Sequence, residues 1–271
     1  MGLYGILGDI HGNREALAAV LAYFDRRRVV GIACVGDIVG YNADSDECAA
    51  IMRNRGVLAI AGNHDLISIG RLNFDRCSNK AAFSLRQTRR RLSPETAWYL
   101  ASLPAHRALG DQVLLVHGGV RDVEQYLVSP THVRRNADFL RSDFPGRAVC
   151  LFGHTHEQKV FEVDGGDVRE LATAQPVTLR DDRIYFVNPG SVDASRKQSK
   201  KLAECALLDI DTLTFEFHSL AYDDGATESR AEQEGYRIGP WTDRLYSLRR
   251  TADWRLRRLL GLTRGHRLRG E

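Results

Sequence analysis

The chain has 271 residues, of which 43% are hydrophobic and 27% are charged, and its formal net charge is only +3. These values indicate a globular protein that buries a full core, and the charge balance alone does not favour any class of partner. No apolar stretch is long enough to span a bilayer and no signal-like segment precedes the first predicted strand, so we expect a cytoplasmic protein. The five cysteines form no Cys-x-x-Cys pair, which favours reduced core residues.

Strands and helices alternate through the first quarter of the chain. Residues 2–8 form an apolar run that predicts a buried strand, and residues 12–25 carry apolar side chains at helical spacing. A second strand is predicted over 29–35, a second helix begins near Asp44, and a third strand follows over 57–61. Alternation with short connections is typical of a layered α/β domain.

The middle of the chain is predicted to be helical from 77 to 103, with Ser93 as the start of its second part. Strands are predicted over 112–116 and 148–152, with a helix over 130–141 between them. We expect the helical insertion to cover the functional residues that follow the strands.

Beyond residue 156 the pattern becomes strand after strand, joined by turns rich in Asp and Gly, which predicts a largely antiparallel sheet. The predicted strands are 158–163, 168–172, 183–187, 203–209 and 213–219. Residues 223–239 are polar and are interpreted as a linker. The predicted organisation is a domain over 1–222, followed over 223–271 by the linker and an arginine-rich amphipathic helix.

Five apolar runs each end on an acid, an amide or a histidine. In an open α/β sheet ligands gather outside the carboxyl ends of the strands, so these side chains are expected to converge. Mixed nitrogen and oxygen donors favour manganese, iron, zinc, nickel or cobalt over magnesium or calcium, and manganese is our first choice among the five. The convergent set is Asp9, His11, Asp37, Asn63, His64, His117, His154 and His156.

This set predicts a centre of two divalent cations that hydrolyses a phosphate ester. Asp37 is the candidate bridge, since one carboxylate can hold two cations roughly 3.5–4 Å apart. A hydroxide held between the cations is a nucleophile available at neutral pH. His64 is the candidate general acid for the leaving oxygen, with Asp65 orienting it, and Asn63 and His64 are expected to face the substrate.

The same residues stand in blocks that resemble the calcineurin-like metallophosphoesterases. The blocks are GDIHG, GDIVG, GNHD, a strand-end His-Gly and GHTH, in this order, and the resemblance covers about residues 2–220. It implies a four-layer αββα sandwich, with two mixed sheets flanked by helices. By the same resemblance, one metal site matches Asp9, His11, Asp37 and His156, and the other matches Asp37, Asn63, His117 and His154.

One departure from the family bears on the substrate. Serine/threonine phosphatases of this superfamily carry an arginine where this chain has residues 40–42, Gly-Tyr-Asn, and a dianionic monoester benefits most from such a clamp. The GDIVGYN form and the segment 188–192 are similar to the small bacterial phosphodiesterase branch. Arg196 is a candidate replacement for the clamp, and a solvated charge is an equally good interpretation of it.

We therefore predict a phosphodiesterase that acts on a nucleotide or nucleic-acid phosphodiester. A phosphomonoesterase is the first alternative, as a phosphoprotein phosphatase or a dinucleoside polyphosphate hydrolase. An alternative of another class is a non-catalytic interaction scaffold, which the complete set of ligands disfavours.

Arginines accumulate from residue 244 to the end, while leucines recur at three- or four-residue steps. Three interpretations of this cationic amphipathic helix compete. Its leucines pack on the domain or on a second copy of the chain, its arginines bind nucleic-acid phosphates, or it lies on a membrane surface.

Overall fold

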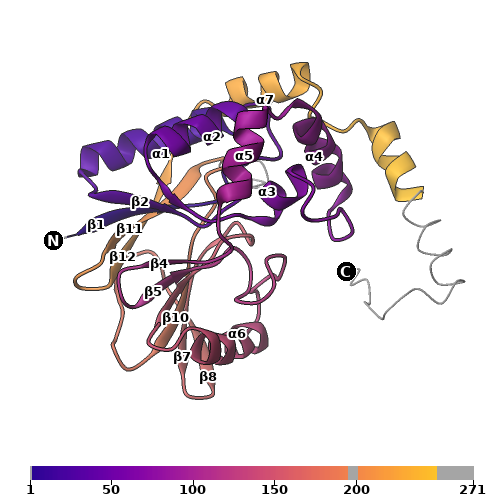
Figure 1. Cartoon of the computed structure of the whole chain (residues 1–271). Helices are drawn as coiled ribbons and strands as arrows, with labels where there is room; N and C mark the ends of the chain where they lie inside the picture. The colour runs from indigo at the N-terminus through magenta and orange to yellow at the C-terminus, as the bar shows by residue number, and fades with distance from the viewer. Residues whose placement is uncertain (1, 195–200, 249–271) are drawn as a thin grey trace, which may run out of the picture.

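Two six-stranded sheets lie face to face in a computed structural model of the chain, which describes residues 2–194 and 201–248 (Figure 1). The first sheet has the order β3 (Leu58–Ala59), β2 (Gly31–Cys34), β1 (Leu3–Leu7), β11 (Ala203–Asp209), β12 (Thr214–Leu220) and β9 (Val177–Thr178). The second has the order β4 (Arg107–Leu109), β5 (Val113–Leu115), β6 (Val149–Leu151), β10 (Ile184–Pro189), β7 (Gln158–Asp164) and β8 (Asp167–Leu171). Both sheets are mixed, because each contains parallel and antiparallel pairs.

Helices cover the outer faces of both sheets (Figure 1). The labelled helices are α1 (Arg14–Arg27), α2 (Ser45–Asn54), α3 (Asn63–Ser68), α4 (Asn79–Arg91), α5 (Pro94–Ser102), α6 (Pro130–Asp143) and α7 (Asp224–Gln233), of which α3 and α4 pack on each other. Helices α1 and α2 pack on the first sheet and α6 packs on the second. The predicted four-layer αββα sandwich is therefore confirmed.

The predicted helical spacing near the N-terminus explains why α1 forms and which face it buries. The Asn13 side chain accepts a hydrogen bond from the backbone N–H of Ala16 and caps the first turn. Five apolar side chains of this helix are buried, and complete burial of each large one contributes about 1.5–3 kcal/mol. They are Ala16, Leu17, Val20, Leu21 and Phe24.

A second core lies between the sheets and fixes their relative position. Ile6 of β1 and Val35, which follows β2, belong to the first sheet's side of this core. They pack with Leu115, Leu151 and Val187 of the second sheet, and all five side chains are fully buried. Close packing tolerates little displacement. The carboxyl ends of β1, β2, β5 and β6 are consequently held against one another.

The strands after residue 156 do not form a sheet of their own, in contrast to the antiparallel sheet that the sequence predicted. Strands β7, β8 and β10 join β4–β6, whereas β11 and β12 extend the edge of β1. Strand β11 pairs antiparallel with β1, for example Leu3 with Asp209. Local patterning predicts a strand but carries no information about the partner with which it pairs.

Residues 224–233, inside the predicted linker, form helix α7. Asp223 caps this helix, and Thr227 and Ala231 are buried where it packs on α1. The Thr227 hydroxyl donates to Asn13 Oδ1 over 3.0 Å. Two small buried residues give no apolar periodicity, so the sequence could not predict this helix.

The predicted amphipathic helix is described only at its beginning. Residues 240–248 are helical, and Tyr246 packs against Phe83 of α4. The arginines from Arg249 onward lie outside the described residues. Among the helices of residues 2–194 and 201–248, none is long and apolar enough to cross a membrane.

Candidate metal centre

All the predicted ligands meet at one edge of the two sheets, although they come from five separate segments. Asp9 and His11 follow β1, Asp37 follows β2, and His117 follows β5. Each side chain of the set is at most 6% exposed. The remaining members are Asn63 and His64, which begin α3, and His154 and His156, which follow β6.

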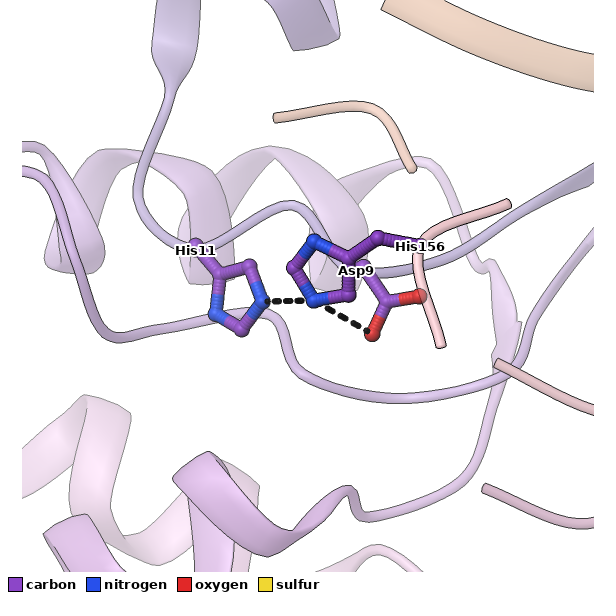
Figure 2. Close-up of side chains that lie close together, drawn as sticks. All are labelled: Asp9, His11 and His156. Carbon is purple, nitrogen blue, oxygen red and sulfur yellow. Dashed lines mark hydrogen bonds and ion pairs between the residues drawn. The ribbon is translucent and has the colours of Figure 1, made fainter. Parts of the chain in front are cut away.

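The first cluster contains Asp9, His11 and His156 (Figure 2). The Nε2 atoms of His11 and His156 are 3.1 Å apart, and His156 Nε2 lies 3.6 Å from Asp9 Oδ1. All three residues offer a donor atom within 4.8 Å of the others, so they could hold one cation.

The second cluster contains Asp37, His117 and His154, whose donor atoms also lie within 4.8 Å of one another. His117 Nε2 lies 3.3 Å from Asp37 Oδ2 and 3.0 Å from Asn63 Oδ1. Asn63 therefore adds an amide oxygen to the carboxylate and the two imidazoles. This is the mixed donor set that first-row divalent metals accept.

One carboxylate oxygen lies between the two clusters. Asp37 Oδ2 is 3.7 Å from His11 Nε2 of the first cluster and 3.3 Å from His117 Nε2 of the second. It is buried, and its contacts with these two imidazoles are longer than an ordinary hydrogen bond. A buried carboxylate oxygen without a short hydrogen bond is costly unless a cation compensates it. Its position fits an atom shared by two cations.

The proton on His117 shows why a cation fits the second cluster. Its Nδ1 lies 2.7 Å from the Val35 carbonyl oxygen, which can only accept, so Nδ1 carries a proton. Nε2 then points at two oxygens, of Asn63 and Asp37. Burial disfavours a charged imidazole, but the Asp37 carboxylate outweighs burial and raises the pKa of His117 to about 9. A positive charge is required at Nε2, as a proton or as a metal ion.

The backbone is strained at the ligands. Seven non-glycine residues in the described part of the chain have a positive φ, and five of them are predicted metal ligands, with φ between 51° and 67°. Such conformations cost of the order of 1–2 kcal/mol each and persist where the surroundings impose them. Asp9 and His11, which both have such a backbone, offer donor atoms within 4.8 Å of each other. The five are Asp9, His11, Asp37, His154 and His156.

Asp65 has different contacts from those that the sequence suggested. Its carboxylate accepts backbone N–H groups from Asp37, Ile38, Val39 and Gly62, at 2.9–3.1 Å. Burial and the negative charge of Asp37 raise its pKa to about 7. Both oxygens are engaged with the backbone, so Asp65 holds the loop that carries Asp37 and does not orient the His64 ring through them.

His64 stands beside both clusters. Its backbone N–H donates to Asp37 Oδ1 over 2.7 Å, and its ring centroid is 4.5 Å from that of His11 and 4.8 Å from that of Tyr41. A methyl group on Gly40 would overlap His64 Nδ1, so the glycine makes room for the ring.

These groups open into a cavity of about 690 Å³. Its walls include Arg76, Glu124 and Tyr126, which come from the segments 68–76 and 119–129. Lys80 and Lys201 also line it and were not predicted. The predicted substrate residue Arg196 lies outside the described residues.

Arg237 is another residue of the cavity wall that the sequence did not reveal. Its guanidinium donates to the Tyr41 carbonyl over 3.0 Å and to Asn42 Oδ1 over 2.9 Å, and it forms two hydrogen bonds of 2.7 Å with Glu228. It thus reaches the loop in which the phosphatases carry their arginine. No sequence pattern distinguishes Arg237 from its polar surroundings.

The family model for the calcineurin-like phosphoesterase superfamily domain matches residues 3–213. The chain belongs to this superfamily. The predicted family is therefore confirmed, and this calcineurin-like phosphoesterase is a metal-dependent hydrolase of phosphate esters.

Relatives of this phosphoesterase include an uncharacterized protein of Methanocaldococcus jannaschii, 29% identical over 226 residues that cover 82% of this chain and 88% of the relative. The crystal structure of a metallophosphoesterase from Sphaerobacter thermophilus is 28% identical, with a TM-score of 0.73 over 89% of this chain and 96% of that one. A hypothetical protein from Pyrococcus horikoshii OT3, 18% identical, shares the fold with a TM-score of 0.66 over 88% of this chain and 95% of that one.

Proposed function

We propose that the protein is a dinuclear-metal phosphodiesterase that acts on a nucleotide or nucleic-acid phosphodiester. The observation that carries the proposal is the position of Asp37 Oδ2, within 3.7 Å of a histidine nitrogen in each cluster. A carboxylate at this place can be shared by two cations, whereas a mononuclear site needs no shared ligand.

The chain's own residues form two overlapping ligand sets. Two divalent cations, when bound, neutralise phosphate charge and lower the pKa of water to near 7, so that hydroxide is available as a nucleophile. The mixed nitrogen and oxygen donors fit manganese, iron, zinc, nickel or cobalt, and manganese is the cation proposed here. Asp9, His11, Asp37 and His156 would hold one cation, and Asp37, Asn63, His117 and His154 the other.

His64 is proposed as the general acid. It borders the cavity beside both clusters and its imidazole can give a proton to the leaving oxygen. Asn63 and His64 are proposed to contact the substrate. Gly40 gives the ring the space it needs, and Tyr41 packs against one side of it.

The charges around residues 40–42 support a diester substrate. A dianionic monoester is best held by an arginine whose fork is free to bind two oxygens. Arg237 reaches this loop, but its N–H groups are engaged by Glu228, Tyr41 and Asn42, and the Glu228 carboxylate compensates its charge. A monoanionic diester requires less compensation. Arg196 remains a proposed substrate contact.

The experiment compares kcat/KM for bis-p-nitrophenyl phosphate and for p-nitrophenyl phosphate in the manganese-loaded protein. We expect the diester to be preferred by about tenfold or more, which corresponds to about 1.4 kcal/mol in the barrier. A preference for the monoester would overturn the diester proposal and favour the phosphomonoesterase alternative. No cleavage of either ester would favour a non-catalytic scaffold.

A further inference from the structure

We propose that Lys80 and Lys201 form a subsite for a second phosphate group of the substrate, next to the centre that cleaves the diester. This inference rests on the proposed function and specifies its substrate class: a phosphodiester that carries an additional phosphate, such as a terminally phosphorylated oligonucleotide. The two lysines line the same cavity as Asp37 and His64.

The other cations of the cavity wall are already compensated. Arg76 lies 2.8 Å from Asp122 and 3.6 Å from Glu124, and Arg237 is bound by Glu228. Neither lysine forms an ion pair or hydrogen bond with any residue in the described ranges. Their charges are consequently available to a ligand, which gives this wall an excess of positive charge.

Glu228, which lines the same cavity, lies within electrostatic range of both lysines. The hydrogen bond from Arg237 is the main reason why the pKa of Glu228 is lowered, and the charges of Lys201 and Lys80 lower it further. Both lysines therefore lie within electrostatic range of one carboxylate. That carboxylate gives both of its oxygens to Arg237, at 2.7 Å each, so hydrogen bonding to the lysines is left to a ligand.

The cavity has room for more than the phosphate that is cleaved. Its volume of about 690 Å³ lies in the range of pockets that enclose a whole small molecule, roughly 300–1,000 Å³. Tyr126 also lines this cavity and is 43% exposed. Its ring centroid lies 4.1 Å from that of His154. An exposed aromatic ring beside the metal centre and two cations in the same cavity suit a nucleotide with its own phosphate.

The test uses the manganese-loaded full chain and thymidine dinucleotides with no terminal phosphate, with a 5′-phosphate, or with a 3′-phosphate. The variants are Lys80→Gln, Lys201→Gln and the double variant. Lys159→Gln is the matched control. It removes the same positive charge from β7, where Lys159 forms an ion pair with Glu157 and does not line the cavity. Bis-p-nitrophenyl phosphate, which has no second phosphate, reports the basal activity.

We expect one terminal phosphate to raise kcat/KM of the parent by about tenfold, as two partly exposed ion pairs would. In each single variant the tenfold gain should shrink to about threefold, and in the double variant the terminal phosphate should give almost no gain. Lys159→Gln should keep the gain, and all variants should cleave bis-p-nitrophenyl phosphate like the parent.

Two results would overturn the subsite: the parent shows no gain from either terminal phosphate, or the double variant retains the gain. Failure of the proposed function looks different, because the parent would then prefer p-nitrophenyl phosphate to bis-p-nitrophenyl phosphate or cleave neither ester. In that case calorimetric titration with thymidine 3′,5′-bisphosphate and thymidine 5′-monophosphate still decides. If the ratio of the two dissociation constants is the same in the parent and the double variant, the lysines bind no second phosphate.

Discussion

The Nε2 atoms of His11 and His156 face each other across 3.1 Å, although 145 positions separate the two residues in the sequence. His11 Nδ1 lies 3.3 Å from the Val39 carbonyl oxygen, which fixes the ring so that Nε2 faces His156. Two imidazole nitrogens that converge beside the Asp9 carboxylate have few uses other than to bind a cation (Figure 2). The fold brings them together through the pairing of β1 with its neighbours and the turn after β6.

Replacement of His64 by alanine tests its role as an acid. We expect kcat for an alkyl phosphodiester to fall by about 10²–10⁴-fold, because a poor leaving group needs the proton most. Bis-p-nitrophenyl phosphate has a better leaving group and should lose much less. The number of metal ions per chain, measured by mass spectrometry, should not change.

His64 also offers a nitrogen within 4.8 Å of donor atoms on His11 and Asp37, so a ligand role makes a distinct prediction. Loss of metal together with an equal loss of activity on both esters would show that His64 binds a cation and is not the acid.

Metal affinity should depend on pH through His117. In the metal-free protein its pKa is raised from 6.5 to about 9, because Asp37 outweighs burial, so a cation must displace a proton below pH 9. Because one proton is released when the cation binds, the dissociation constant for manganese should fall by about tenfold for each unit that the pH rises between 7 and 8.5. A competition assay with a metal indicator measures it, and a constant unaffected by pH would contradict this assignment.

The same proton has a consequence for stability without metal. The pKa of His117 is higher in the folded than in the unfolded protein, so protonated His117 stabilises the metal-free fold. This contribution is fully present below pH 6.5 and is lost as the pH rises through about 9. Urea unfolding of the chelator-treated protein should therefore show a lower midpoint at pH 9 than at pH 6.5.

Gly62→Ala should disrupt the site by steric overlap, without any backbone strain. The residue has a φ of −92°, which alanine adopts freely, but an added Cβ would overlap the carboxylate and backbone of Asp37. We expect a loss of about 1–3 kcal/mol in the free energy of unfolding, together with a large loss of metal binding. Gly166→Ala is the control, since its Cβ would meet nothing within 4 Å. Equal behaviour of the two variants would show that the contact with Asp37 is unimportant.

The C-terminal arginines lead to a separate prediction about nucleic acid. Removal of residues 249–271 eliminates Arg249 and the arginines beyond it, while the contact of Tyr246 with Phe83 is kept. If these arginines bind phosphates, affinity for single-stranded DNA should fall steeply with added salt in the full chain and be largely lost after truncation. Unchanged binding after truncation would leave helix packing or self-association as the role of this segment, and gel filtration of both forms separates those two.

The ligands could be predicted from the sequence because each stands directly after an apolar run, and parallel strands present such positions at one edge. Asp37 and His117 are examples: 80 residues apart, they follow β2 and β5, and their side chains meet at 3.3 Å. The partners of the later strands, such as β11 with β1, depend on long-range pairing that no local pattern encodes.

The rest of the cavity could not be predicted for a similar reason. Lys80, Lys201 and Arg237 come from segments with ordinary polar composition. Lys80 lies on α4, Lys201 precedes β11 and Arg237 follows α7, so only tertiary packing brings them to one cavity. Asp65 was assigned to His64 because the two are adjacent in sequence. Its hydrogen bonds instead join α3 to the loop after β2, a contact that spans 28 residues.

The number of metal ions per chain tests the central claim most directly, because two clusters joined by one carboxylate should hold a coupled pair. After reconstitution with manganese, we predict two ions per chain and an electron paramagnetic resonance spectrum of two coupled ions. Asp37→Asn should lose the coupling and reduce kcat/KM for bis-p-nitrophenyl phosphate by at least about 100-fold, since even outer partners of metal ligands contribute 10–100-fold. Asp25→Asn, at an exposed acid paired with Arg55, should behave like the parent. Two uncoupled ions, one ion per chain, or an Asp37→Asn variant with full activity would contradict the account.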